Sequence, residues 1–312
     1  MPLDPQCQEL LTALEAMELP AFADMTPEEC RQTVLGFTML MGEPEDVAKV
    51  EDREIPAPDG PVPVRIFTPA GAGPEPQPVL VYFHGGGFVF GNCELIDPIT
   101  RTLANKSGCV VVSVDYRLSP EHRFPAAIED AYAVARWVVD HASDIGGDPA
   151  RVAVAGDSAG GNLSTVVCLM AKDRGGPPIA FQVLIYPVVD SSMEQPSYAE
   201  NAEGPILTVR DIQYFWNHYL PSEGDRTQTY ASPLRAEDLS GLPPAMVITA
   251  EFDPLRDEGE EYGQRLAQAG VPTEVRRYHG MFHGFFWMPA AIDRGRDCMD
   301  DIAETLRKAL SA

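Results

Sequence analysis

The sequence predicts an α/β fold, with a mostly parallel, twisted sheet covered by helices on both faces. From about residue 124 onward, short apolar strands alternate with helices, which is typical of parallel strands joined by helical crossovers. Before that point three strands follow one another at 61–67, 78–83 and 109–116, and this predicts an antiparallel edge. The 312 residues are enough for one large core or two modest domains.

The first fifty residues predict helices. Leu10, Leu11, Leu14 and Met17 recur at helical spacing, and residues 26–29 form a capping box with proline at the first helical position. The later predicted elements are, in order, helix 124–142, strand 151–156, helix 161–172, strand 181–189, strand 245–250, helix 257–269, strand 273–278 and helix 291–310.

Residues 191–225 interrupt this alternation. They are polar, are punctuated by Pro and Gly, and contain one predicted helix at 208–220. The apolar residues of that helix share a single face, namely Ile212, Phe215, Trp216, Tyr219 and Leu220. We interpret this insertion as a lid, because long loops in compact domains are usually functional. The alternative is an ordinary surface excursion packed on the core.

The chain is strongly acidic, with a formal charge of −24 and an isoelectric point near 4.5. Such a surface repels nucleic acid phosphates and anionic lipid headgroups, so neither nucleic acid nor a membrane is an expected partner. No stretch approaches the roughly 18–20 apolar residues of a membrane span. The N-terminus lacks the basic region of a signal peptide, so a cytoplasmic protein is expected.

The cysteine pattern predicts free thiols and no zinc or redox site, because no C-x-x-C pair occurs. The six cysteines are Cys7, Cys30, Cys93, Cys109, Cys168 and Cys298. No metal or cofactor is expected. The glycines at 85–87 are not followed by GK[ST], and Phe90 stands where a dinucleotide motif would have its third glycine.

Residues 156–160 read Gly-Asp-Ser-Ala-Gly and stand between an apolar strand and a predicted helix. The G-x-S-x-G spacing in this context predicts a tight turn that exposes the Ser158 hydroxyl at the carboxyl edge of the sheet. Because a serine hydroxyl is a poor nucleophile, it needs a histidine base and an acid that orients the base.

In this fold the acid and then the histidine follow the serine along the chain. His279 and His283 both lie near the end of the last predicted strand, and their positions alone leave the choice open. For the acid, Asp253 is favoured because it lies on a loop directly after a strand. Asp190, at the end of the preceding strand, is the alternative.

Three consecutive glycines at 85–87 follow the predicted strand 78–83. Their backbone N–H groups can approach an oxyanion closely, and with the N–H of Ala159 they predict an oxyanion hole beside Ser158. A further set of aromatic residues either walls an apolar acyl pocket or packs in the core: Phe88, Phe215, Trp216, Phe282 and Phe285.

The chain resembles the hormone-sensitive-lipase family of bacterial esterases, which have the α/β-hydrolase fold. Four motifs carry the resemblance in the same order: HGGG at 84–87, GDSAGG at 156–161, DPLRDE at 253–258 and HGF at 283–285. A fifth segment, YRLSPEH at 116–122, resembles the YRLAPEH segment of the family, with serine in place of alanine.

The resemblance implies a triad of Ser158, Asp253 and His283, and so selects His283 over His279. It also implies that Gly85, Gly86 and Ala159 donate to the oxyanion, while His84 braces the glycine loop.

The resemblance further implies a helical cap over the site. The predicted organisation is an N-terminal part of the cap at 1–50, a catalytic core at 51–190 and 226–312, and a cap insertion at 191–225. Small-molecule esters with short acyl chains are the implied substrates, and a homodimer is an implied assembly.

The sequence therefore predicts a serine carboxylesterase that works through an acyl-enzyme. An amidase or aryl formamidase with the same triad is the alternative. A non-catalytic small-molecule receptor is disfavoured, because all three members of the triad are present.

Overall fold

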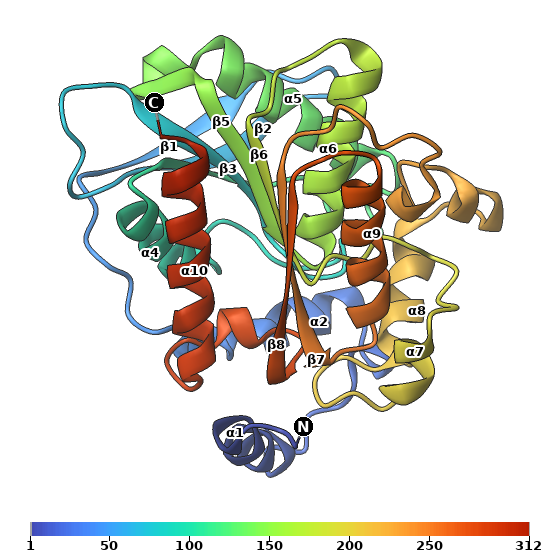
Figure 1. Cartoon of the computed structure of the whole chain (residues 1–312). Coiled ribbons are helices and arrows are strands. Elements are labelled where there is room, and N and C mark those ends of the chain that lie inside the picture. Colours follow the sequence, from blue (N-terminus) through green and yellow to red (C-terminus); the bar gives the residue numbers. More distant parts are fainter. Residues whose placement is uncertain (1, 312) are drawn as a thin grey trace.

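An eight-stranded sheet forms the centre of the structure, a computed structural model that describes residues 2–311 (Figure 1). The outermost residues of the predicted segments 1–50 and 226–312 lie outside the described residues. In chain order the strands are β1 (Lys49–Ile55), β2 (Val62–Thr68), β3 (Gln77–Phe83), β4 (Val110–Val114), β5 (Gly147–Asp157), β6 (Phe181–Ile185), β7 (Ala245–Phe252) and β8 (Thr273–Phe282).

Across the sheet the strands are ordered β1-β2-β4-β3-β5-β6-β7-β8. β1 pairs antiparallel with β2, and β2 pairs antiparallel with β4. All pairings from β4 to β8 are parallel. The predicted α/β class and the predicted antiparallel edge are both confirmed.

Helices lie on both faces of the sheet. In chain order they are α1 (Pro5–Glu15), α2 (Pro27–Leu35), α3 (Thr38–Met41), α4 (Asp97–Ser107), α5 (Ala126–Asp140), α6 (Ala159–Arg174), α7 (Pro196–Glu200), α8 (Val209–Tyr219), α9 (Arg256–Gln268) and α10 (Asp293–Ala309). α4 and α10 pack together on one face, and α5, α6 and α9 cover the other (Figure 1). Because the central strands are covered on both sides, every residue of β4 and β6 is buried.

Strand β1 is an element that the sequence pattern does not reveal. Its residues, KVEDREI, are mostly charged, and only Ile55 is buried. β1 is the edge strand of the sheet and pairs with β2 alone, so it does not need the apolar alternation that marks a half-buried strand. Helix α4 is likewise absent from the predicted elements.

The segment 191–225 contains more than the one helix predicted for it. The short helix α7 precedes α8, and a 3₁₀ turn η3 (Glu223–Thr227) follows it. α8 begins with a capping box, in which the Thr208 hydroxyl accepts the Asp211 N–H at 3.1 Å and Thr208 donates its own N–H to Asp211 at 2.9 Å.

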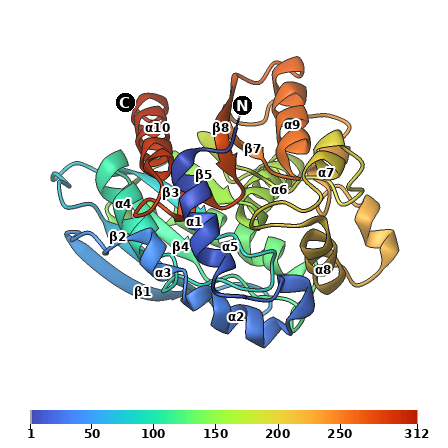
Figure 2. The same ribbon diagram turned by 90° about the horizontal axis from the view of Figure 1, so that it is seen from below.

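The N-terminal helices α1 and α2 lie across the same end of the sheet as α8 (Figure 2). A 3₁₀ turn, η1 (Phe22–Asp24), joins them and is fixed to the start of α8. The Ala23 N–H donates to the buried Asp211 carboxylate at 2.8 Å, and Arg210 pairs with Asp24 at 2.8 Å. Two segments that are far apart in the sequence therefore form one layer of structure.

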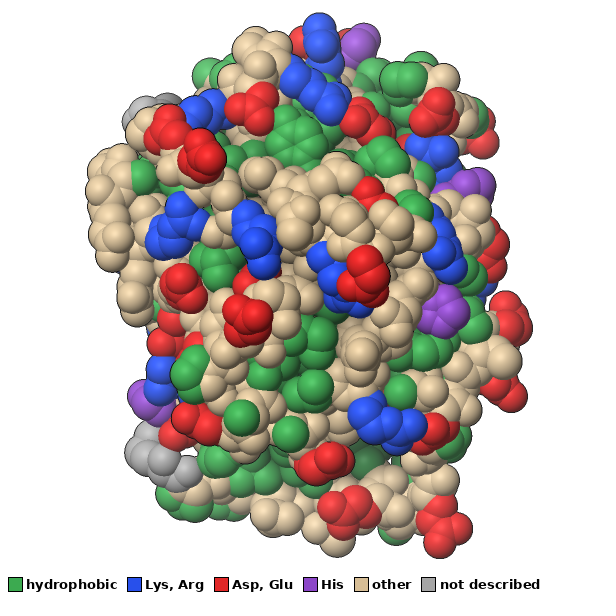
Figure 3. Space-filling view, turned by 90° about the vertical axis from the view of Figure 1, so that its right-hand side faces the viewer, with side chains coloured by type: hydrophobic (Ala, Val, Ile, Leu, Met, Phe, Trp, Pro, Cys, Tyr) green, Lys and Arg blue, Asp and Glu red, His purple; other side chains and the backbone are tan. Residues whose placement is uncertain are grey.

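The surface carries acidic and basic side chains interspersed with one another, as Figure 3 shows for one face. All six cysteines are buried and unpaired, as the sequence predicts. Within residues 2–311 no helix is long and apolar enough to cross a membrane. Over the same residues no group of His, Cys, Asp or Glu side chains is arranged to hold a metal ion.

Candidate active site

Ser158 lies in a tight turn between strand β5 and helix α6. Its φ of 54° and ψ of −115° form a strained conformation for a residue with a side chain. The turn requires small neighbours. A Cβ on Gly160 would lie 1.9 Å from the Phe83 carbonyl oxygen, and a Cβ on Gly156 would lie 2.3 Å from that of Gly160. The G-x-S-x-G spacing is therefore a steric requirement of this turn.

His283 is the first residue after β8 and contacts Ser158. Its Nε2 lies 3.1 Å from the Ser158 Oγ, and its Nδ1 lies 2.8 Å from the Asp253 Oδ2. Asp253 follows β7 and is fully buried, and its other oxygen accepts the Leu255 N–H at 2.9 Å. The structure thus brings together the serine, histidine and aspartate that the sequence selects.

The two alternatives weighed from the sequence lie elsewhere. The last strand runs four residues beyond its predicted end, so His279 is still within β8, half-exposed beside Glu251 at 3.3 Å. Asp190 accepts the Ser192 N–H at 3.1 Å and lies 3.5 Å from Arg235. Neither His279 nor Asp190 has a contact with the Ser158 hydroxyl among the described residues.

The glycine loop lies beside Ser158, but the N–H groups left without a protein acceptor are shifted by one residue from the predicted donors. The Gly85 N–H donates to the Asp157 Oδ1 at 3.0 Å, so Gly85 does not offer a free donor and its predicted role is wrong. The N–H groups of Gly86, Gly87 and Ala159 have no protein acceptor among residues 2–311. Gly86 and Gly87 also line the cavity at Ser158, whereas Gly85 does not.

His84 packs beneath the glycine loop, where the sequence places a brace. Its ring stacks on Tyr116 at 4.3 Å between centroids, and its Nδ1 lies 2.7 Å from the Gly85 carbonyl oxygen. Tyr116 donates its hydroxyl to the His84 carbonyl at 2.8 Å. Burial lowers the pKa of His84, which favours a neutral ring.

Asp157 is a buried carboxylate that the sequence analysis does not single out. It directly precedes Ser158, and its Oδ1 also accepts the Tyr82 hydroxyl at 2.6 Å. Burial raises the pKa of Asp157 to about 6, although the Tyr82 and Gly85 hydrogen bonds act in the opposite direction. The sequence does contain a sign of this role, because Asp157 is the middle residue of the G-x-S segment. A carboxylate at a turn between a buried strand and a helix needs hydrogen-bond donors around it.

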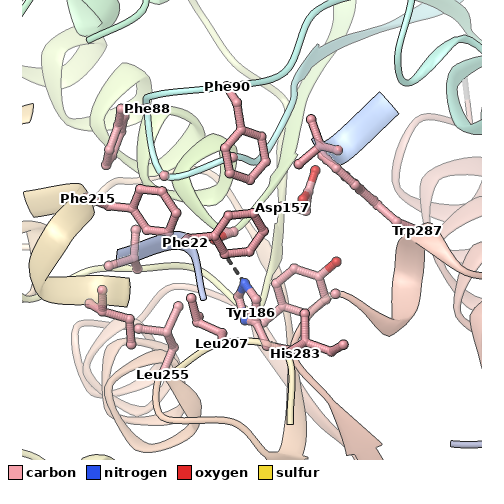
Figure 4. A pocket seen from close by; sticks show the side chains of 18 of the residues that line it. Phe22, Phe88, Phe90, Asp157, Tyr186, Leu207, Phe215, Leu255, His283 and Trp287 are labelled. Atoms are coloured by element: carbon pink, nitrogen blue, oxygen red, sulfur yellow. Dashed lines mark hydrogen bonds between the residues drawn. The ribbon is translucent and has the colours of Figure 1, made fainter. Parts of the chain in front are cut away.

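A cavity of about 820 Å³, counted with the open space at its mouth, adjoins Ser158 and His283 (Figure 4). Its walls are almost entirely apolar. Of the five aromatic candidates, Phe88, Phe215 and Trp216 line this cavity. The apolar and aromatic lining residues that were not predicted to wall a pocket are Phe22, Val34, Phe37, Phe90, Tyr186, Val188, Ile206, Leu207, Ile212, Leu255, Trp287 and Met288.

Phe282 and Phe285 do not line the cavity. Both are fully buried. Phe285 lies against Tyr186 at 5.9 Å and Tyr278 at 5.1 Å between ring centroids, and Phe282 ends β8 opposite Phe252. These two phenylalanines belong to the core, which is the alternative weighed for them.

Residues 80–287 match a protein family described by the alpha/beta hydrolase fold. The chain belongs to this α/β-hydrolase family. The resemblance to hormone-sensitive-lipase-like esterases is confirmed, because similar curated proteins are named as esterases. The esterase LipI of Mycobacterium tuberculosis is 45 % identical over 279 residues, which cover 88 % of this chain and 86 % of the relative. An arylesterase of Saccharolobus solfataricus is 36 % identical over 290 residues, covering 93 % and 94 %.

Solved structures of α/β-hydrolases are similar along the whole chain. A hyperthermophilic esterase from Pyrobaculum calidifontis has a TM-score of 0.93 and 44 % identity, and the match covers 100 % of both chains. An ester hydrolase from the Lake Arreo metagenome, solved with a bipyridine phosphonate derivative, has a TM-score of 0.96 and 41 % identity, and the match covers 99 % and 100 %. The α/β-hydrolase fold assignment therefore extends beyond the matched residues 80–287.

Proposed function

We propose that this α/β-hydrolase is a serine carboxylesterase that cleaves small esters with short acyl chains. The observation that carries the proposal is the continuous hydrogen-bonded series from Ser158 through His283 to the buried Asp253, at 3.1 and 2.8 Å. The naming of its relatives as esterases and carboxylesterases supports ester hydrolysis as the reaction class.

In the first half of the reaction, the Ser158 Oγ attacks the ester carbonyl carbon while its proton passes to the His283 Nε2. Asp253 accepts from the His283 Nδ1–H, which holds the ring in the tautomer whose Nε2 is a base. The carbonyl oxygen becomes an oxyanion, for which the unoccupied N–H groups of Gly86, Gly87 and Ala159 are the proposed donors.

The His283 imidazolium then gives its proton to the leaving alcohol, which completes the first half and leaves an acyl-Ser158 ester. The second half is the hydrolysis of this ester. A water molecule then attacks this ester while His283 takes its proton, and the acid leaves as Ser158 recovers its hydrogen. Apart from the ester and this water molecule, the steps use only the side chains and backbone N–H groups named above.

The size and chemistry of the cavity support short, apolar substrates. Aromatic rings of Phe22, Phe90 and Phe215 lie next to one another at 5.3 to 5.8 Å between centroids and limit the space beyond the serine. Few polar side chains line the cavity, so a charged acyl group would lose its hydration without a partner.

The test measures hydrolysis of p-nitrophenyl butyrate by the purified wild type and by the Ser158→Ala variant. Both proteins are also treated with a fluorophosphonate probe, which labels a reactive serine. We expect turnover and labelling of the wild type and neither for the variant. Turnover by Ser158→Ala at the wild-type rate would contradict the proposal. Faster cleavage of butyryl p-nitroanilide than of the ester would instead favour the amidase alternative.

Two further properties are part of the proposal. The protein is proposed to act in the cytoplasm, which six unpaired thiols and the acidic surface support, and cell fractionation tests this location.

The protein is also proposed to form a homodimer through β8, the other edge strand of the sheet, where Val275 is 40 % exposed. The molar mass in solution, measured by light scattering after size-exclusion chromatography, tests the dimer.

A further inference from the structure

The cavity at Ser158, here called the inner cavity, shares three lining residues with a second depression. The second depression, here called the outer groove, lies between α1, the segment from residue 19 to 22 and the loop before α8. It measures about 800 Å³ with its open space. Phe22, Phe37 and Ile206 line both spaces and so form the wall between them.

The outer groove has the chemistry of a hydrocarbon site. Its lining is mainly apolar and includes Leu11, Leu14 and Leu19. The polar side chains of the lining are Glu15, Thr33, Thr208 and Asp211, and the Asp211 carboxylate is already bound to the N–H groups of Ala23 and Thr208. Leu19 is 42 % exposed, although apolar side chains of this size usually bury more of their surface. Figure 3 shows further apolar surface toward the bottom of its view, the level at which the N-terminal helices lie in Figure 1.

The three wall residues, Phe22, Phe37 and Ile206, have no polar side-chain atoms, so no side-chain hydrogen bond holds them in place. Phe22 contributes only its ring, which stacks on Phe90 at 5.3 Å on the side of the inner cavity (Figure 4). The backbone around it is held independently, since the next residue, Ala23, donates its N–H to Asp211. The Phe22 ring can therefore be removed while the turn η1 keeps its anchor.

We propose that the outer groove is a second subsite for an aliphatic chain, and that Phe22 and Ile206 decide whether a chain from Ser158 reaches it. This inference rests on the proposed esterase function and extends it to chain-length specificity. A chain that outgrows the inner cavity meets the wall and remains in water. A chain that passes the wall leaves water on the outer groove, which favours binding by roughly threefold to fourfold for each methylene buried.

The experiment compares kcat/KM for p-nitrophenyl decanoate with kcat/KM for p-nitrophenyl butyrate, so that each variant serves as its own reference. Phe22→Ala and, independently, Ile206→Ala are expected to raise the decanoate-to-butyrate ratio by about tenfold or more. Two variants on different segments protect the test against misfolding of either one. An unchanged ratio in both would overturn the proposal.

A second pair of variants shows where the chain lies. Leu14→Trp, which fills the outer groove from α1, is expected to return the ratio of the Phe22→Ala variant to the wild-type value. Ala13→Trp adds the same side chain on the exposed face of the same helix and is expected to leave the raised ratio in place. A gain that survives Leu14→Trp would place the chain elsewhere and overturn the proposal.

The chain could belong to the acid or to the alcohol, so decyl acetate is assayed beside the decanoate ester. A gain confined to the decanoate assigns the groove to the acyl chain, and a gain confined to decyl acetate assigns it to the alcohol. Either result supports the subsite. If the wild type does not hydrolyse the butyrate ester, both the proposed function and the subsite are refuted. If it does, and the decanoate-to-butyrate ratio is unchanged in both wall variants, only the subsite is refuted.

Discussion

The backbone N–H of Gly85 donates to the carboxylate of Asp157 at 3.0 Å, which ties the glycine loop to the turn that carries Ser158. The nucleophile and its proposed oxyanion donors therefore share one anchor. A Cβ on Gly85 would lie 2.2 Å from the second oxygen of Asp157, so the close approach also depends on the missing side chain. Asp157 acts through its neighbours and is a positioning residue.

Loss of the Asp157 anchor should lower kcat more than it changes KM. In Asp157→Ala the Gly85 N–H and the Tyr82 hydroxyl lose their acceptor, so the loop no longer aims the N–H groups of Gly86 and Gly87. We expect a fall of about a hundredfold in kcat, as for the loss of one oxyanion donor. Asp157→Asn keeps an acceptor oxygen and should recover most of it. Equal activity of the alanine and asparagine variants would contradict the role.

The buried Asp157 should make stability depend on pH in a defined window. Its pKa is raised from 3.8 to about 6, so the folded protein holds this proton more tightly than the unfolded chain. Between these two pH values the unfolded aspartate ionises first, and the wild type loses roughly 3 kcal/mol as the pH rises.

Asp157→Asn cannot ionise and should lack this loss. Urea unfolding of both proteins from pH 4 to pH 7 checks the expectation. The difference in the free energy of unfolding, variant minus wild type, should grow across this window and level off above pH 6. A constant difference across the range would show that burial does not shift this carboxyl.

The two histidines weighed from the sequence give a matched pair of variants. His283→Asn removes the group at 3.1 Å from the Ser158 Oγ and should lower kcat by roughly 10⁶-fold. His279→Asn alters a half-exposed ring beside Glu251 and should leave kcat/KM close to the wild-type value. Steady-state hydrolysis of p-nitrophenyl butyrate measures both. The opposite result would move the base to His279.

The turn at Ser158 should not tolerate a methyl group at Gly160. That Cβ would lie 1.9 Å from the Phe83 carbonyl oxygen, and overpacking against backbone has no inexpensive relief. Gly160→Ala should lose about 3 kcal/mol or more of stability. Gly71→Ala, whose Cβ would meet nothing within 4 Å, is the control. Thermal melting decides, and equal melting temperatures of the two variants would refute the steric argument.

The N-terminal segment should loosen when Asp211 is replaced. The buried Asp211 carboxylate accepts hydrogen bonds from the N–H groups of Ala23 and Thr208, at 2.8 and 2.9 Å. Loss of these two hydrogen bonds should lower the free energy of unfolding by about 2 kcal/mol. Asp211→Ala should therefore increase cleavage by trypsin within residues 1–50. Arg210→Ala removes only the exposed pair with Asp24, which contributes little, and should digest like the wild type.

The parts of the site that depend on local sequence could be predicted. Ser158 is identified by its own neighbours, because the turn, the glycines and the flanking strand and helix are all encoded within a dozen residues. The central strands could be predicted for a similar reason, since burial on both faces leaves an uninterrupted apolar run. The charged edge strand β1 has no such signature.

The parts that depend on exact register or on tertiary contacts could not be predicted. The choice between Gly85 and Gly87 as a donor depends on which N–H meets Asp157, and the positive φ of Gly86 and Gly87, 115° and 58°, sets the direction of these groups. Phe22 reaches the inner cavity only because its segment is fastened to α8. No pattern near residue 22 reports that attachment.

The burial of every cysteine provides the folded chain with internal reporters of its own opening. Cys7 packs against Met281 at 3.7 Å, and Cys30 lies 3.8 Å from Tyr214, so both thiols are covered only while the N-terminal helices stay in place. Cys109 and Cys168 lie within the sheet and its helices. An alkylating reagent would thus mark the first pair when the N-terminal helices open locally and the second pair only after global unfolding, which distinguishes the two events.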